Sequence, residues 1–174
     1  MNFPILSSLI LLPIIGSLFL LFSKDKNSNT GKYVALFTSF VNFLISIYLW
    51  YQFDPSTSNF QFVEDREWLK GFINYKVGID GISILFIVLT SLITPLCIIS
   101  VNNTIKDRLR DFLIAILVME SLMIGVFCSL DLVIFYLFFE AGLIPMFLII
   151  GIWGGTRRVY SAFKFFLYTL LGSV

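Results

Sequence analysis

Six stretches of the chain are almost entirely apolar, and short polar segments separate them. They cover residues 3–22, 33–53, 82–101, 112–130, 132–152 and 162–174. Five have the length of about 20 residues that a helix needs to cross a bilayer, whereas the sixth is shorter. The pattern predicts an all-α fold, a polytopic transmembrane helix bundle with five full spans and a truncated sixth. Because no polar stop follows the last stretch, residues 1–174 are expected to be the N-terminal part of one longer transmembrane domain.

The segment 54–81, between the second and third stretches, is the longest polar region. Phe60 and Phe62 alternate with polar neighbours, as do the apolar residues of 73–79, and this is the period of a β-strand. The sequence predicts a small β-hairpin that caps the helices on the outer side, with residues 65–71 in its turn. Four acidic residues before residue 70 are interpreted as a solvated face: Asp54, Glu64, Asp65 and Glu67.

Basic residues between the stretches predict the orientation, because cytoplasmic or matrix loops of membrane proteins carry an excess of Lys and Arg. The first, third and fifth connections together hold eight of them: Lys24, Lys26, Lys32, Lys106, Arg108, Arg110, Arg157 and Arg158. The N-terminus and the fourth connection hold none, and the second holds only Arg66, Lys70 and Lys76. The N-terminus is therefore predicted to lie outside.

Composition narrows the range of functions. Only 13% of the residues are charged, 12 Lys and Arg against 11 Asp and Glu, whereas a soluble domain carries about a quarter. A soluble enzyme, a DNA-binding domain and a disordered tail are excluded, and no nucleic-acid partner is expected. The chain has no His, and its two Cys are too few to hold an iron–sulfur cluster. Any redox chemistry is therefore expected in another subunit.

Three charged residues interrupt the apolar stretches: Glu120, Glu140 and Lys164. A charge near the bilayer centre costs at least about 2.5–3.5 kcal/mol, so such residues are rare and usually functional. At the helical rise, Glu120 lies about 15 Å before the end of its stretch, and Glu140 about 12 Å after the start of the next. Because only Asp131 joins these stretches, both carboxyls are predicted near the membrane midplane on antiparallel neighbours. Both are candidates for binding and releasing protons.

A structural interpretation stays open for each of these residues. Glu120 and Glu140 could be neutral, hydrogen-bonded acids that hold helices together, or one of them could pair with Lys164. Lys164 could instead extend its amine to the basic inner surface beside Arg157 and Arg158. Spacing alone does not show that the two glutamates face each other.

Four segments are similar to a known family. They are YKVGIDGIS at 75–83, Glu120 with GVF at 125–127, FYLFFEAGLIPM at 135–146 and AFKFFLYT at 162–169. In this order they resemble the antiporter-like proton-pumping subunits of respiratory complex I, most closely the branch called subunit 4 or chain M. The resemblance covers the whole chain, and the glutamate followed by Leu-Ile-Pro-Met is its most specific part.

The resemblance implies a membrane subunit of a proton-translocating NADH:quinone oxidoreductase in which Glu140, Glu120 and Lys164 transfer protons. It implies no cofactor on this chain, since NADH, FMN, iron–sulfur clusters and quinone would bind partner subunits. Antiporter-like membrane subunits and lipid would surround it, in a bacterial plasma membrane or a mitochondrial inner membrane. Two alternatives remain, a subunit of a multi-subunit sodium/proton antiporter and a structural membrane subunit whose acids only fix helix packing.

Overall fold

The computed structural model describes residues 4–22, 29–69, 73–101, 105 and 107–174, which form six helices and one two-stranded antiparallel sheet. The helices are α1 (Ile5–Phe22), α2 (Asn29–Gln52), α3 (Ser83–Ser100), α4 (Leu109–Cys128), α5 (Leu132–Trp153) and α6 (Arg158–Ser173). The strands β1 (Gln61–Leu69) and β2 (Ile73–Ile79) lie between α2 and α3 in the chain. Helices α1 to α5 are long and apolar enough to cross a membrane. The prediction of a helix in each apolar stretch is confirmed.

Several helices extend beyond their predicted bounds where charged residues flank the apolar stretch. Helix α2 includes Lys32, α4 begins at Leu109 rather than at residue 112, and α6 begins at Arg158 rather than at residue 162. A prediction from hydropathy ends the stretch at the first charged residue. Lys and Arg nevertheless form helices well and extend their side chains to the membrane surface, so the helix continues past them. The outward N-terminus stays a prediction, and part of its basis lies outside the described residues: Lys24, Lys26, Lys70 and Lys106.

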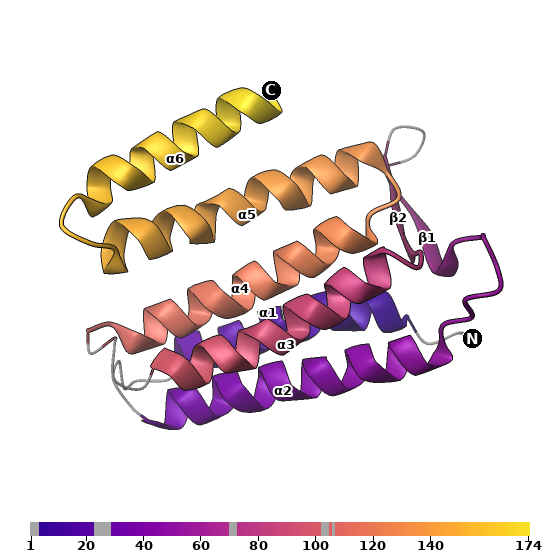
Figure 1. Cartoon of the computed structure of the whole chain (residues 1–174), viewed down its shortest axis with the longest axis horizontal. Coiled ribbons are helices and arrows are strands. Elements are labelled where there is room, and N and C mark those ends of the chain that lie inside the picture. The colour runs from indigo at the N-terminus through magenta and orange to yellow at the C-terminus, as the bar shows by residue number, and fades with distance from the viewer. Residues whose placement is uncertain (1–3, 23–28, 70–72, 102–104, 106) are drawn as a thin grey trace.

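Helix α4 is the centre of the bundle, because it packs against α1, α2, α3 and α5. Helix α6 packs against α5, and Figure 1 shows these two helices at one edge with the hairpin at one end of the bundle. Close approach of α4 and α5 depends on Gly125. A Cβ atom at this position would lie 2.6 Å from the ring of Phe138 on α5, so a larger residue would require the ring or the helix to shift.

The predicted hairpin is confirmed, but its turn is shorter than predicted. Asp65 and Arg66 pair with Lys76 and Tyr75 across the ladder, so residues 65–69 belong to β1 and not to the turn. Charged residues are compatible with a strand that has one face exposed to water. Val77 is fully buried against the ends of α1 to α4, and the hairpin therefore covers one end of the helix core.

Glu64 is not part of a solvated acidic face, contrary to the prediction. Its Oε1 accepts hydrogen bonds from the backbone N–H groups of Leu6 (2.9 Å) and Ser7 (3.3 Å), and its Oε2 accepts one from the Ser7 hydroxyl. These N–H groups lie in the first turn of α1, where no helical carbonyl can accept from them. The Ser7 hydroxyl also lies 3.1 Å from the hydroxyl of Tyr75, whose pKa is raised by burial. Glu64 thus joins the hairpin to the start of α1.

The exterior of the helices is apolar and their interior contains polar groups, the reverse of a soluble protein. Large hydrophobic side chains are exposed along the outer faces, with exposed fractions of 69% for Phe19, 70% for Phe37 and 77% for Leu171. So extensive an apolar surface is unstable in water and matches the hydrocarbon core of a bilayer. The chain is therefore a multi-pass membrane protein.

Candidate functional site

Two apolar clusters fill the two ends of the core formed by α1 to α4, and polar side chains lie between them. The cluster beneath the hairpin includes Leu9, Leu49, Ile87 and Ile124, and the cluster at the other end includes Leu20, Ala35, Ile98 and Leu117. On each helix the buried polar residues fall between these two sets: Ser17, Ser39, Asn42, Ser46, Ser91, Thr94, Glu120 and Ser121. We call these eight residues the polar layer. It crosses the core about halfway along the helices.

Glu120 on α4 carries the acidic group of the polar layer, and its side chain is only 2% exposed. Nδ2 of Asn42 on α2 donates a hydrogen bond of 2.9 Å to Oε1 of Glu120. The remaining oxygens of the two groups, Oδ1 of Asn42 and Oε2 of Glu120, are buried and have no hydrogen-bond partner among the described residues. The structure thus places Glu120 inside the bundle, facing α2.

The hydroxyl groups of the polar layer join helices to one another or bond to their own backbone. The Oγ atoms of Ser46 and Ser91 lie 2.7 Å apart and link α2 to α3. Ser121 donates to the carbonyl oxygen of Ile10 and links α4 to α1. Three others donate to carbonyl oxygens within their own helices: Ser17, Ser39 and Thr94. Because these hydroxyls bond elsewhere, the hydrogen-bond donor to Glu120 within the described part of the chain is Asn42.

Asn42 is a site residue that the predictions from sequence miss, although the sequence contains a pattern that points to it. Ser39, Asn42 and Ser46 follow one another at intervals of three and four residues inside an apolar stretch, which puts them on one helix face. A side-chain amide in a membrane span needs a partner from another helix, because lipid offers none. A carboxyl group in another span could have been sought as that partner.

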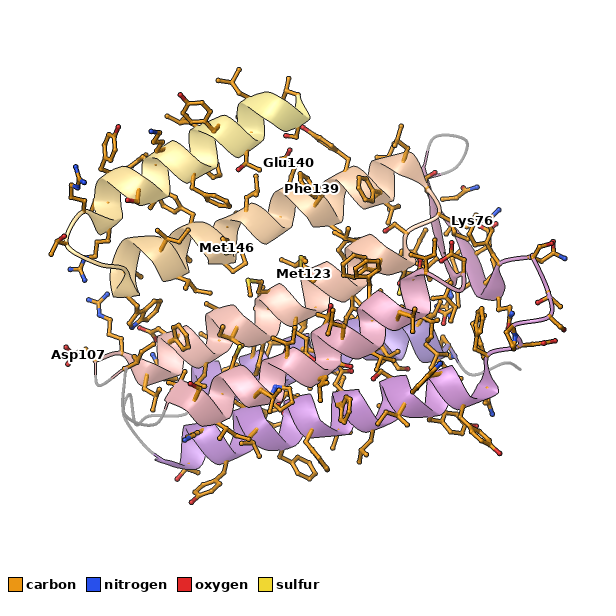
Figure 2. The ribbon with its side chains drawn as sticks, in the orientation of Figure 1. Lys76, Asp107, Met123, Phe139, Glu140 and Met146 are labelled. Atoms are coloured by element: carbon orange, nitrogen blue, oxygen red, sulfur yellow. The ribbon has the colours of Figure 1, made fainter. Side chains whose placement is uncertain are left out.

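Glu140 lies on α5 and faces α6. The hydroxyl of Ser173, near the end of α6, donates to its Oε1, and Figure 2 shows the Glu140 side chain on the side of α5 that faces α6. Glu120, in contrast, is bonded to α2. The two carboxyls therefore have partners on different sides of the α4–α5 pair, and within the described part of the chain no hydrogen bond joins them.

Lys164 lies on the exposed face of α6. Its amine is 6.0 Å from the ring centroid of Tyr160 and 5.9 Å from that of Tyr168, one helical turn away on either side. Helix α6 contacts α5 through another face, on which Ala162 is buried. No ion pair between Lys164 and Glu140 is formed by the described residues.

Two carboxylates in the segments that carry the family resemblance, or next to them, act as helix caps. Asp80 accepts hydrogen bonds from the backbone N–H groups of Ile82 (3.2 Å) and Ser83 (2.7 Å) at the start of α3. These bonds hold the pKa of Asp80 below its usual range. Asp131 accepts in the same way from Val133 (2.8 Å) at the start of α5. Both residues lie outside the spans, and their contacts are structural.

Comparison with known proteins relates the chain to one group of membrane subunits. Residues 129–174 match the family model described as NADH:quinone oxidoreductase/Mrp antiporter, TM. The chain is 59% identical over 150 residues to NADH-quinone oxidoreductase subunit M of Rhodobacter capsulatus, covering 86% of this chain and 28% of that protein. It is 48% identical over 171 residues to NADH-ubiquinone oxidoreductase chain 4 of Arabidopsis thaliana, covering 97% and 34%. The chain spans about a third of the length of these relatives.

A solved structure shares the fold. It is the membrane-bound sulfane sulfur reductase, described as an archaeal respiratory membrane complex, and one of its chains aligns with a TM-score of 0.75. The alignment covers 95% of this chain and 25% of that chain. At 18% sequence identity the likeness concerns the fold alone.

Proposed function

We propose, from the premise that this chain is a homologue of NADH-quinone oxidoreductase subunit M and NADH-ubiquinone oxidoreductase chain 4, that it works within a membrane subunit of a proton-translocating NADH:quinone oxidoreductase. The observation that carries the proposal is the extent of the similarity, 48% identity over 97% of the chain. Five helices of membrane-spanning length, with carboxyl groups inside two of them, suit a subunit that moves protons.

Glu140 is the proposed proton-transfer group. It is the one charged residue of α5, and it lies within the residues that the family model matches. Its partner Ser173 has a hydroxyl, which can donate to a charged carboxylate and can accept from a protonated acid. The contact can therefore persist in both protonation states. A carboxyl with such a partner can take up and release a proton without losing its hydrogen bond.

Glu120 and Lys164 are proposed as further members of the proton path. Glu120 would hold a proton inside the core of α1 to α4, where its side chain is buried. Lys164 would exchange protons with groups beyond the exposed face of α6, because its amine lies on that face. A change of charge at such groups shifts the balance between the loaded and empty states of Glu140, which couples distant events to proton movement.

Electron transfer is proposed to occur in partner subunits, which would carry NADH, FMN, iron–sulfur clusters and quinone. In the described part of the chain no group of three or more His, Cys, Asp or Glu is placed to hold a metal ion. The proposed neighbours are antiporter-like membrane subunits and lipid, in a bacterial plasma membrane or a mitochondrial inner membrane. A native gel of the source membranes, stained for NADH oxidation and analysed by mass spectrometry, tests this assembly, because peptides of this chain must appear in the stained band.

Glu140→Gln in the full-length subunit tests the proton-transfer role. Glutamine keeps an oxygen that accepts from Ser173, but it cannot bind and release a proton, so NADH-driven pumping is expected to be lost or sharply lowered while the complex assembles. Asp65→Asn is the matched control, because it makes the same change from acid to amide in the exposed hairpin. Normal pumping by Glu140→Gln would contradict the proposal.

A second candidate function follows from the wording of the matching family, which includes Mrp antiporters. In that case the chain would be part of a multi-subunit sodium/proton antiporter, and a sodium gradient would drive proton movement without NADH. The relatives described above carry oxidoreductase names, which favours the first function.

A third interpretation is a structural membrane subunit in which the acids only fix helix packing. It holds if Glu140→Gln leaves transport and assembly unchanged.

A further inference from the structure

A charge on Glu120 would have no compensating cation on the helices that form its core. Helices α1 and α3, which pack against α4, contain no charged residue. Helix α2 contains Lys32, which lies about 15 Å along the helix from Asn42 at the rise of an α-helix. Burying an ionised carboxylate without a cation is strongly unfavourable. The surroundings of Glu120 therefore favour a neutral side chain.

The remaining elements that contact α4 do not supply the missing cation. The charged residue of α5 is Glu140, itself an acid, and it is bonded to α6. The charged residue of β2 is Lys76, whose amine lies 3.6 Å from the Asp65 carboxylate in the exposed hairpin. On α4 itself, Arg110 pairs with the adjacent aspartate near the start of the helix, about 15 Å from Glu120.

The polar atoms of Asn42 and Glu120 lack one hydrogen-bond donor. Nδ2 donates to Oε1 at 2.9 Å, and this leaves Oδ1 and Oε2 as two buried acceptors without a partner in the described residues. A charged carboxylate offers no donor, whereas a protonated one carries an O–H group. The amide and the carboxyl are both planar and are already joined by one hydrogen bond. A single proton on Oε2 can therefore supply the missing hydrogen bond, with Oε2 as the donor and Oδ1 as the acceptor.

We propose that Asn42 and Glu120 form a proton-holding pair in the middle of the bundle, in which Glu120 carries its proton on Oε2 and donates it to Oδ1 of Asn42. Asn42 is the positioning residue of the pair, because its amide donates to one oxygen of the acid and accepts from the other. Release of the proton leaves two acceptor oxygens without a donor, so it requires a water molecule or a rearrangement to supply one. A role of the pair in proton translocation rests on the proposed function, whereas the protonated state of Glu120 does not depend on it.

Neighbouring contacts hold both members of the pair in place. Ser46 lies one turn after Asn42 on the same face of α2, and its bond to Ser91 fixes that face against α3. Ser121 follows Glu120 on α4, and its bond to the backbone of α1 fixes the neighbouring turn. The amide and the acid are thus set on helices that are themselves joined to the core.

Infrared spectroscopy of the full-length subunit in its lipid-embedded complex tests the pair. At neutral pH the wild-type protein is expected to show the C=O stretch of a protonated carboxylic acid, and this band is expected to be lost in Glu120→Gln. Glutamine suits the site as an assignment variant because its amide can donate to Oδ1 and accept from Nδ2. In Asn42→Leu the band is expected to move to higher frequency, because the acid loses its hydrogen-bond partners.

Ser39→Ala is the matched control, because it removes a buried hydroxyl from the same face of α2, and that hydroxyl donates to the backbone of its own helix. It is expected to leave the band in place. Absence of a Glu120 band at neutral pH in the wild type overturns the proposal, and so does a band that Asn42→Leu does not move. If Asn42→Leu does not assemble, Asn42→Ala gives the same test, because alanine has no side-chain atom that can form a hydrogen bond with the acid. None of these spectra depends on NADH, so loss of the pair and loss of the pumping function are told apart.

Discussion

Glu64→Ala is expected to destabilise the fold although the residue lies on a short strand outside the spans. The carboxylate accepts from the backbone N–H groups of Leu6 (2.9 Å) and Ser7 (3.3 Å) and from the Ser7 hydroxyl. It therefore acts as an N-terminal cap of α1, supplied from 57 or more residues away in the chain. Removing it leaves two N–H groups of the first turn without their acceptor and removes the hydrogen bonds that join β1 to α1.

The magnitude follows from the contacts that are lost. Loss of a side-chain cap at a helix N-terminus costs about 0.5–2 kcal/mol, and loss of a negative charge there costs about 0.3–1 kcal/mol more. Glu64 is partly buried, so we expect Glu64→Ala to lower the free energy of unfolding by about 2 kcal/mol. Glu64→Gln keeps one acceptor oxygen for these N–H groups and is expected to lower it by about 1 kcal/mol.

The free energy of unfolding can be measured on the full chain in mixed detergent micelles, from helical circular dichroism as the fraction of dodecyl sulfate rises. Asp65→Asn is the control on the adjacent residue. Its ion pair with Lys76 is long (3.6 Å) and both side chains are about half exposed, so the change is expected to stay below about 0.5 kcal/mol. Equal effects of Glu64→Ala and Asp65→Asn would refute the capping role.

Four further predictions use the same titration. Gly125→Ala would place a methyl group 2.6 Å from a ring of α5 and is expected to cost about 1–3 kcal/mol. Gly142→Ala meets open space and is expected to be neutral or stabilising by up to about 1 kcal/mol. Hydrogen bonds lower the folded-state pKa of Asp80, so the stability that its carboxylate contributes is present above about pH 4 and is lost as the pH falls through that pKa. Asp80→Asn should therefore reduce the dependence of the free energy of unfolding on pH in this range. Asn42→Leu should cost about 1–3 kcal/mol, and Glu120→Leu in addition should recover part of it, whereas additive losses would contradict the pair.

The spans could be predicted because the thickness of the bilayer sets the length of an apolar helix, and that length is visible in one dimension. The alternation of residues 73–79 likewise indicates a strand. The predicted turn begins too early, because a hairpin with one face in water accommodates the charged residues 65–67 within its strand. The role of Glu64 depends on a contact with Leu6 of α1, which lies 58 residues away in the sequence, and no local pattern predicts such a contact.

The acidic members of the candidate site could be found because charge is rare inside membrane spans. Their partners could not, because these depend on which helices are neighbours in space. Asn42 meets Glu120 only because α2 lies beside α4, although α3 stands between them in the chain. Ser173 meets Glu140 because α6 folds back along α5.

The direction of Glu120 follows from the residues on its own helix. Glu120 lies three residues after Leu117 and four before Ile124, and both of these are fully buried, so the acid falls on the stripe of α4 that faces the core. The side of α4 toward α5 is marked instead by Gly125, which admits the ring of Phe138. Moving the acid by one position would turn it by about 100° around the helix, and at position 121 it would replace Ser121, which is bonded to α1 instead of α2.

The same reasoning directs Glu140 elsewhere. It lies seven residues before Phe147, two helical turns away on the same face, and the Phe147 ring packs against Phe163 of α6 at a centroid distance of 5.3 Å. Glu140 therefore falls on the stripe of α5 that faces α6, as its bond to that helix shows. Two carboxyls predicted at a similar depth thus lie in separate environments, Glu120 in the core of four helices and Glu140 at the contact of two. Because they share no partner among the described residues, their effects on helix packing are expected to add, and a measured coupling between Glu120→Gln and Glu140→Gln would have to come from proton transfer.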